Sequence, residues 1–211
     1  MPMIPTKNPA ALIGYYLGIV SLIPILGFVL GLPAIICGVI GAIKASSDKQ
    51  AGGMGHAITA IVLGVVGPLL WVGLHVVKVL VSLVAGPLAD RLGRRRLVAT
   101  GWIVYALVYA GFAFAHGPWQ VAALFVVYGA YHGLTEGAEK AMIADRVPSD
   151  RRGAAFGAYH LVVGILAVPS SVLFGLVWEM VSPRAAFLAG AALAIAALPL
   201  LALVTPPPRA A

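Results

Sequence analysis

The sequence predicts an all-α, polytopic helical membrane protein. Of its 211 residues, 61% are hydrophobic and only 10% are charged, whereas about a quarter of the residues of a soluble domain are charged. The charges also cluster, because long apolar stretches without a charge alternate with short groups of Lys and Arg. This alternation is typical of membrane spans joined by loops. We therefore expect the surface of the chain to face the lipid bilayer.

The net charge of +7 does not indicate nucleic-acid binding, because the basic residues lie in short loops between apolar runs and not on one polar face. The chain has no nucleophile elbow and no phosphate-binding loop, so we expect neither an enzyme nor a nucleotide-driven pump. The histidines are scattered and Cys37 is the single cysteine, so we expect no metal site, no cofactor and no internal disulfide. Met1–Asn8 does not resemble a cleavable leader.

The first apolar run, Ala10–Ile43, would form a helix of about 50 Å, which is too long for a bilayer core of about 30 Å. Pro24 and Gly27 predict a tight helical hairpin broken around Ile23–Gly27. Basic residues flank both ends of the run, so both ends are expected on the cytoplasmic side, and the short arms favour a re-entrant hairpin. Small residues at the spacing that permits close helix contact occur in each arm, as Gly14 with Gly18 and Gly27 with Gly31.

The stretch His56–Asp90 leaves two interpretations open. It is either one long broken helix or a short helix 56–67 followed by a full span from Pro68. The remaining apolar runs predict four spans, Leu97–Ala115, Gln120–Ile143, Gly153–Trp178 and Ala185–Val204.

The distribution of Lys and Arg predicts the orientation. Nine basic residues fall on one side, and only Arg184 falls on the other. By the positive-inside rule, we expect loops 44–55, 90–96 and 144–152 and the C-terminus to be cytoplasmic, in a bacterial inner membrane.

Ionisable residues within spans usually mark a pathway or a partner, because they are costly in lipid. Lys78 lies about 18 Å of helix rise before Asp90, Glu136 about 13 Å before Asp145, and His160 about 12 Å after Arg152. One hypothesis is a polar cavity in which Glu136 is the proton-coupling residue; it is lined by Lys78, His132, Glu136 and His160. The alternative is a structural Glu–Lys pair, which we prefer for Glu139 and Lys140, while both stay open for Glu136.

Two charged loops carry the most specific pattern in the chain. The first reads Gly86-Pro-Leu-Ala-Asp90-Arg91-Leu-Gly93-Arg94-Arg95-Arg96, and the second contains Asp145-Arg-Val-Pro148 and Arg152-Gly153. With the spans around them, they make residues 68–204 resemble helices eight to twelve of a major facilitator superfamily transporter. The resemblance implies that these loops stabilise one conformation of a two-bundle machine, with Gly86, Asp90, Arg91, Gly93, Arg94, Arg95, Arg96, Asp145 and Arg152 in that gating role.

Residues 9–67 resemble a small bacterial membrane module, domain-of-unknown-function family 4190, through Ala11-Leu-Ile-Gly-Tyr-Tyr-Leu-Gly18 and Gly52-Gly-Met-Gly-His56. We therefore predict a hairpin module at 1–67, a partial transporter bundle at 68–205 and a proline-rich tail at 206–211. Seven helices of the transporter pattern are missing, so the join could be a natural gene fusion, a truncated paralogue or an artificial one.

These resemblances imply a half-size secondary transporter for an unidentified small solute, acting as a homo-oligomer or with a partner subunit. The alternative function is a non-transporting membrane scaffold.

Overall fold

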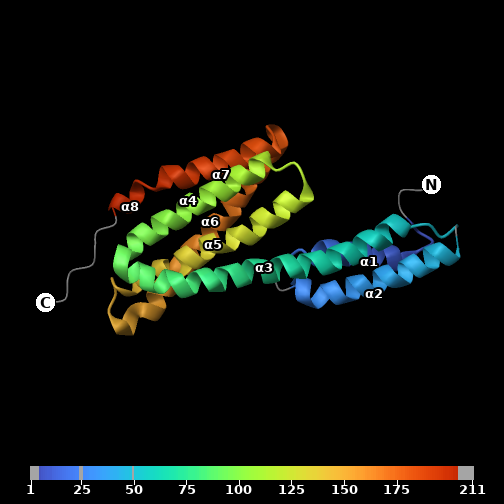
Figure 1. Cartoon of the computed structure of the whole chain (residues 1–211), viewed down its shortest axis with the longest axis horizontal. Coiled ribbons are helices and arrows are strands. Elements are labelled where there is room, and N and C mark those ends of the chain that lie inside the picture. The colour runs from blue at the N-terminus through green and yellow to red at the C-terminus, as the bar shows by residue number, and fades with distance from the viewer. Residues whose placement is uncertain (1–4, 24–25, 49, 204–211) are drawn as a thin grey trace. The chain divides into compact units, whose positions relative to one another are not determined.

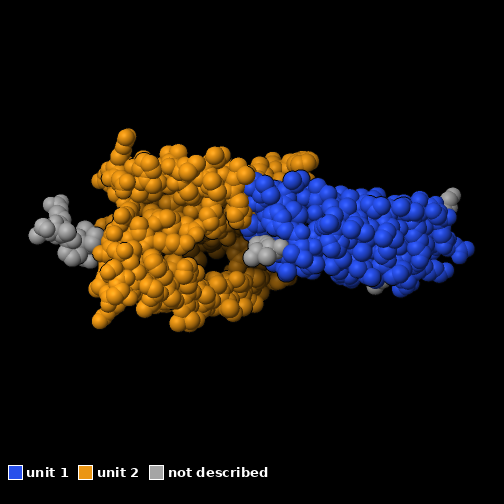
Figure 2. Space-filling model, turned by 90° about the horizontal axis from the view of Figure 1, so that it is seen from below, with its two compact units in different colours: residues 1–73 blue, residues 74–211 orange. Residues whose placement is uncertain are grey.

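The structure is a computed structural model that describes residues 5–23, 26–48 and 50–203. Every regular element in these residues is a helix, which confirms the predicted all-α class. Among the described residues, four helical segments are long and apolar enough to cross a membrane: Leu26–Ser47, Met54–Leu92, Arg94–Phe114 and Ser149–Met180. The predicted spans Gln120–Ile143 and Ala185–Val204 are not among them. The chain divides into two compact units, residues 1–73 and 74–211, which are shown in blue and orange in Figure 2.

The first unit contains the predicted hairpin. Helix α1 covers Pro9–Val20, and α2 covers Leu26–Ser47 beside it (Figure 1). Pro24 of the predicted break lies outside the described residues, as does the proline-rich tail. With 12 residues, α1 is about 18 Å long and too short to cross a bilayer core of about 30 Å. The second arm, α2, has 22 residues and is long enough to cross, so the re-entrant hairpin stays a prediction.

Small residues bring the helices of the first unit into backbone contact. Gly14 and Gly18 of α1 and Gly27 and Gly31 of α2 are buried. A Cβ atom on Gly31 would lie 2.8 Å from the carbonyl oxygen of Gly64 in the following helix. The small-residue spacing therefore marks real helix contacts, as the sequence predicts.

Asn8 fastens the start of α1 to the rest of the first unit. Its side chain is fully buried. The amide nitrogen donates to the carbonyl oxygens of Gly41 at 2.8 Å and Gly52 at 3.0 Å, and Oδ1 accepts from the Ala11 N–H at 3.3 Å. One polar side chain thus satisfies three backbone groups that belong to three segments.

The stretch His56–Asp90, for which the sequence left two interpretations open, belongs to a single helix. Helix α3 runs from Met54 to Leu92 and continues through Gly67-Pro68. Its 39 residues are about twice the 20 that one span needs, and its residues are shared between the two units. It ends where Gly93 adopts a positive φ of 87°, a conformation that side chains other than glycine rarely take.

The second unit is a helical bundle formed by the end of α3 and the later helices (Figure 1). These helices are α4 (Arg94–Phe114), α5 (Pro118–Ala144), the short 3₁₀ helix η1 (Ser149–Arg151), α6 (Arg152–Met180), α7 (Pro183–Ala197) and α8 (Leu200–Leu203). Helix α5 begins with Pro118 in its first turn, and the Ser182 side chain accepts from the Ala185 N–H at the start of α7.

The last predicted span, Ala185–Val204, is divided into two helices in the structure. Helix α7 ends at Ala197, and α8 begins at Leu200. Pro199 lies between them and has no N–H to donate to the carbonyl four residues before it, so the α-helical pattern stops there. Val204 lies outside the described residues.

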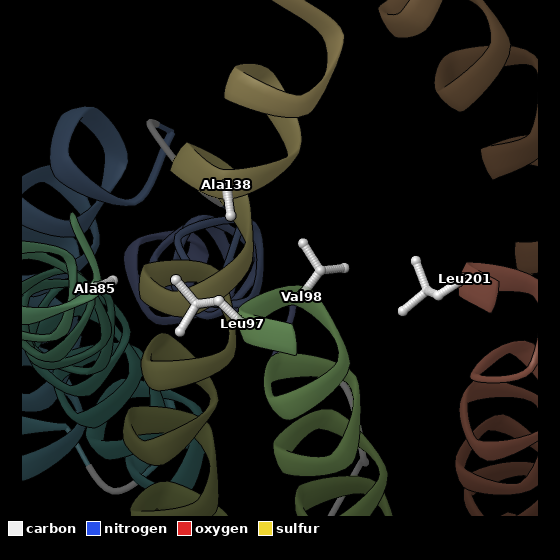
Figure 3. Packing of buried hydrophobic residues seen from close by; sticks show 5 residues of the cluster. All are labelled: Ala85, Leu97, Val98, Ala138 and Leu201. Carbon is white, nitrogen blue, oxygen red and sulfur yellow. The ribbon is translucent and has the colours of Figure 1, made fainter. Parts of the chain in front are cut away.

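A small apolar core closes the end of the second unit where α3, α4 and α5 meet. Leu97 and Val98 are each 1% exposed, and they form a cluster with Ala85, Ala138 and Leu201 (Figure 3). Because Leu97 and Val98 directly follow the basic run at the start of α4, this core fixes the position of the Gly86–Arg96 segment.

Replacing Asn8 with Ala should destabilise the chain. The change removes the side-chain donor from the buried Gly41 carbonyl and from the part-buried Gly52 carbonyl, which costs about 1–3 kcal/mol. Denaturation by SDS in mixed micelles, followed by circular dichroism, measures the loss. Ser46→Ala is the control, because its exposed hydroxyl bonds only within its own helix. Equal stability of the two variants would contradict the role given to Asn8.

Candidate functional site

Three charged side chains meet between α3 and α5 in the second unit. The Glu136 carboxylate accepts from two ammonium groups, with Oε2 2.5 Å from Lys78 Nζ and Oε1 2.8 Å from Lys140 Nζ. The side chains are 29% exposed for Lys78, 40% for Glu136 and 44% for Lys140. We call this group the Glu136 cluster. Lys140 belongs to the same helix as Glu136, one turn further on, whereas Lys78 joins two helices.

The Glu136 cluster depends on a close approach of the two helix backbones. Gly129 and Gly133 of α5 are buried against α3. A Cβ atom on Gly129 would lie 2.2 Å from the carbonyl oxygen of Leu74, and one on Gly133 would lie 2.7 Å from that of Lys78. The Ser82 hydroxyl lies within bonding distance of two carbonyl oxygens, at 2.8 Å from Lys78 and 3.4 Å from Gly133. Only glycine at these α5 positions leaves room for this contact.

The other predicted cavity residues are placed differently. His132 is half-buried one turn before Glu136, and its ring packs against those of Tyr128 and Tyr131 at centroid distances of 4.9 and 4.8 Å. His160 is exposed on α6, with its ring 5.1 Å from that of Tyr159. The structure therefore joins Lys78 to Glu136 directly, keeps His132 on the same helix as Glu136, and shows no hydrogen bond, ion pair or ring contact between His160 and the other three. A cavity lined by all four stays a prediction.

Glu139 has a separate partner. Its Oε2 accepts from the Tyr159 hydroxyl at 2.8 Å, which connects α5 to α6. Sequence reasoning favoured a pair between Glu139 and Lys140, but Lys140 binds Glu136 instead. Glu136 and Lys140 are four residues apart, the spacing at which side chains on a helix face each other. This spacing could have predicted their pair.

The residues of the predicted gating segment gather at one end of the second unit. Arg94 forms an ion pair with Asp145 and also donates to the carbonyl oxygen of Ala141 at 3.3 Å. Asp90 is exposed and makes no ion pair with any described residue. The ion pair thus joins the start of α4 to the end of α5, and not to the end of α3.

A cavity of about 280 Å³ lies beside this ion pair. Among its lining residues are Gly86, Asp90 and Arg94 from the first charged loop and Gly133 and Gly137 from α5. Arg95 is partly buried, whereas the side chains of the other predicted basic residues of the two loops, Arg91, Arg96 and Arg152, are exposed. The first charged loop is therefore packed on α5 through Arg94, while most of its other basic groups face outward.

A larger cavity of about 590 Å³ lies between α4, α6 and α7, and sequence reasoning missed it. We call it the aromatic cavity. Its lining residues are Tyr105, Tyr109, Ser170, Ser171, Leu173, Phe174, Val177, Ala186, Ala189, Gly190, Leu193 and Ala194. The sequence contains two related features: Tyr105 and Tyr109 lie four residues apart in one helix, and Ser170 and Ser171 are adjacent in another. Neither feature reveals a cavity by itself, because its walls come from three helices.

No group of three or more His, Cys, Asp or Glu side chains in the described part of the chain could hold a metal ion. The Glu136 cluster offers one carboxylate that two lysines already occupy. The chemistry open to it is the exchange of a proton or of an ionic partner.

Comparison with known proteins places most of the chain in a single family. The model of the Major Facilitator Superfamily matches residues 53–211. The chain is 37% identical over 114 residues to an uncharacterized MFS-type transporter of Methanocaldococcus jannaschii, covering 54% of this chain and 28% of the relative. It is 34% identical over 149 residues to the multi-drug resistance efflux pump PmrA homolog of Lactococcus lactis, covering 69% and 32%.

A third relative is the Na(+), Li(+), K(+)/H(+) antiporter of Planococcus maritimus, 31% identical over 119 residues, or 54% of this chain and 28% of that protein. The chain thus spans less than a third of the length of each of these curated relatives. No solved structure matches it.

Gly129→Ala should separate α5 from α3 and weaken the contact between Lys78 and Glu136. The added methyl group overlaps the Leu74 carbonyl, and such overpacking costs about 1–3 kcal/mol. Denaturation in mixed micelles measures this loss. Gly137→Ala is the matched control on the same helix, because a Cβ atom there meets nothing within 4 Å. If both variants are as stable as the parent chain, the close contact between Gly129 and the Leu74 carbonyl is contradicted.

Proposed function

The chain belongs to the major facilitator superfamily, and on that premise we propose that it takes part in secondary transport of a small solute, coupled to proton movement through Glu136. It is a transporter-like, multi-pass membrane protein, and its family indicates a transporter rather than an enzyme. The coupling residue, the solute, the orientation and the assembly are our proposals.

The observation that carries the proposal is the shared position of Glu136 between Lys78 and Lys140. Charged groups within a span are retained where they serve a pathway or a partner. Two ammonium groups favour the ionised carboxylate, so a proton can bind Glu136 only when it displaces the lysines, and its binding then releases α3 from α5. One of the matched relatives is named as a cation/proton antiporter, which supports the proposal that this chain also couples to protons.

In the proposed cycle, a proton that binds Glu136 cancels its charge and ends both ion pairs. The two ammonium groups then repel each other, since no counter-charge remains between them. The link between α3 and α5 through Lys78 opens, while the Arg94–Asp145 pair between α4 and α5 keeps its charges. Proton binding thus changes one helix junction of the unit and leaves the second in place.

We propose that loops 44–55, 90–96 and 144–152 and the C-terminus lie on the cytoplasmic side of a bacterial inner membrane. The basic residues of two of these loops, among them Arg94 and Arg152, stand at the starts of α4 and α6. An excess of such residues beside spans is favoured on the cytoplasmic side. The C-terminus and Lys49 lie outside the described residues.

We further propose that transport uses a second helical bundle, from a second copy of this chain or from a separate subunit. Transporters of this superfamily move two bundles around a central site. The assignment of residues 68–204 to helices eight to twelve, and of residues 9–67 to family 4190, also remains our proposal. The family match begins at residue 53 and the compact units divide after Gly73, so neither coincides with the predicted boundary after Gly67.

The alternative is a scaffold in which the same ion pairs only fasten α3 to α5. Both functions use the Lys78–Glu136 contact, and they differ in whether Glu136 changes its charge. A neutral replacement at this position therefore separates them.

Glu136→Gln should abolish proton movement driven by solute while the chain remains in the membrane. The amide keeps the size of the side chain and loses the exchangeable charge. Inside-out membrane vesicles that contain the full chain, loaded with a pH-sensitive dye, report proton release when ethidium, muconate, xylose or a sodium salt is added. Glu179→Gln is the control, because Glu179 is exposed near the end of α6.

Proton movement that is present with the parent chain, present with Glu179→Gln and absent with Glu136→Gln is the expected outcome. Equal proton movement in both variants would remove Glu136 from the coupling role. If none of the four solutes moves protons with the parent chain, the scaffold function is favoured.

If a second copy supplies the missing bundle, amine-reactive cross-linking in native membranes should trap a species of twice the 21.7 kDa chain mass. The yield should not depend on expression level, because a specific interface is saturated at low density. A yield that rises in proportion to the density of the chain indicates random collision and contradicts the dimer.

A further inference from the structure

The aromatic cavity has the size and the lining of a small-molecule site. Its volume of about 590 Å³ falls within the range of about 300–1,000 Å³ that is usual for pockets of drug-sized ligands. Its walls belong to α4, α6 and α7, and none of its lining residues belongs to the Glu136 cluster. It is therefore a second site within the same unit.

One wall of the cavity is a set of aromatic rings held by one another. Tyr105 and Tyr109 are stacked with ring centroids 4.1 Å apart. Phe174 packs edge-on against Phe187 at 5.4 Å, and Phe187 in turn contacts Tyr109 at 5.6 Å. Rings that support one another keep their faces in place before a ligand arrives, which reduces the cost of binding.

The part of the cavity wall that α7 supplies consists mainly of small residues. Ala186, Ala189, Gly190 and Ala194 all line the cavity. The ring of Tyr109 lies so close to Gly190 that a Cβ atom there would be 2.8 Å from its Cδ1 atom. The tyrosine thus packs on the α7 backbone, and the alanines beside it leave the cavity open.

The polar groups in the lining are few and uncharged. Ser170 and Ser171 donate their hydroxyl hydrogens to the Ala167 carbonyl at 2.9 and 2.8 Å. Toward a ligand, each hydroxyl group can therefore act only as an acceptor. The tyrosine hydroxyls can donate or accept. None of the lining residues is Asp, Glu, Lys, Arg or His. An ion would therefore lose its hydration without a counter-charge, and a sugar would lack partners for most of its hydroxyl groups.

Ring contacts connect this cavity to the face of α5 that carries the Glu136 cluster. Tyr105 of the cavity wall contacts Tyr131 at 5.1 Å, and Tyr131 contacts His132 at 4.8 Å, one turn from Glu136. Movement of the Tyr105 ring on ligand binding can thus reach α5 through packed side chains.

From this lining, we propose that the aromatic cavity binds an uncharged aromatic molecule that carries one hydrogen-bond donor. This inference rests on the proposed function in so far as the molecule is the transported solute, but binding itself requires no transport. The rings of Tyr105, Tyr109 and Phe174 contact the aromatic part, and the serine lone pairs accept from the donor group.

Binding of N-phenyl-1-naphthylamine, an uncharged aromatic amine that fluoresces in apolar surroundings, tests the proposal. The full chain in phospholipid nanodiscs should give a saturable signal above that of empty nanodiscs. Ala189→Trp fills the cavity and should remove this signal. Ala192→Trp is the matched control, because Ala192 is also exposed on α7 but does not line the cavity.

A displacement series defines the ligand class. 1-Naphthol, which is uncharged, should displace the dye at a concentration at least about tenfold lower than 1-naphthoate, whose charge finds no partner in the lining. Xylose should not displace it. Displacement by naphthoate as effective as by naphthol would overturn the assignment to an uncharged ligand.

Two further results would overturn the proposal. One is an equal saturable signal in Ala189→Trp and Ala192→Trp, or none in the parent chain. The other is a phospholipid that copurifies with the parent chain but not with Ala189→Trp and that the dye does not displace, since lipid would then be the occupant. Because binding is measured without a proton gradient, it can hold while Glu136→Gln retains proton movement, so the two proposals can fail separately.

Discussion

The close backbone approach of α5 to α3 is the constraint on which the rest of the second unit depends. Gly129 and Gly133 lie so near the Leu74 and Lys78 carbonyl groups that no side chain fits between the helices. At this separation, Lys78 can reach Glu136. A bulkier residue at either glycine would move α5 outward and separate Lys78 from Glu136.

Helix α5 is attached to its neighbours in different ways along its length. Toward the charged loops, Arg94 of α4 binds Asp145 just beyond the last residue of α5. Further along the helix, the attachment is the shared carboxylate of Glu136, and beyond it the tyrosine rings lead toward the aromatic cavity. A change in the charge of Glu136 thus acts at a junction between a fixed end and a ligand-sized cavity.

The helix pattern could be predicted from the sequence, because charged groups and the residues Pro and Gly mark the ends of apolar runs. The break at Pro199 was missed because the apolar run continues through it, although proline stops the helix there. The stretch through Gly67-Pro68 stayed open because sequence alone does not decide whether a helix continues through a proline, and in α3 it does.

The site was only partly predictable for a different reason. The spacing of Glu136 and Lys140 places them on one helix face, so their pair follows from the sequence. The Lys78–Glu136 pair and the Arg94–Asp145 pair depend on which helices become neighbours, which local periodicity does not encode. Arg94 binds Asp145, which follows α5, although Asp90 lies only four residues before Arg94 in the chain. The aromatic cavity was missed for the same reason, because its lining residues come from three helices whose packing the local sequence pattern does not encode.

Infrared difference spectroscopy of the full chain in membranes, with and without solute, tests the central claim most directly. If Glu136 exchanges a proton during the cycle, the spectrum should contain a protonated carboxylic acid band that changes with solute and is absent in Glu136→Gln. A spectrum in which the carboxylate of Glu136 stays ionised in every state would contradict the coupling role and leave the Lys78–Glu136 pair as a structural link.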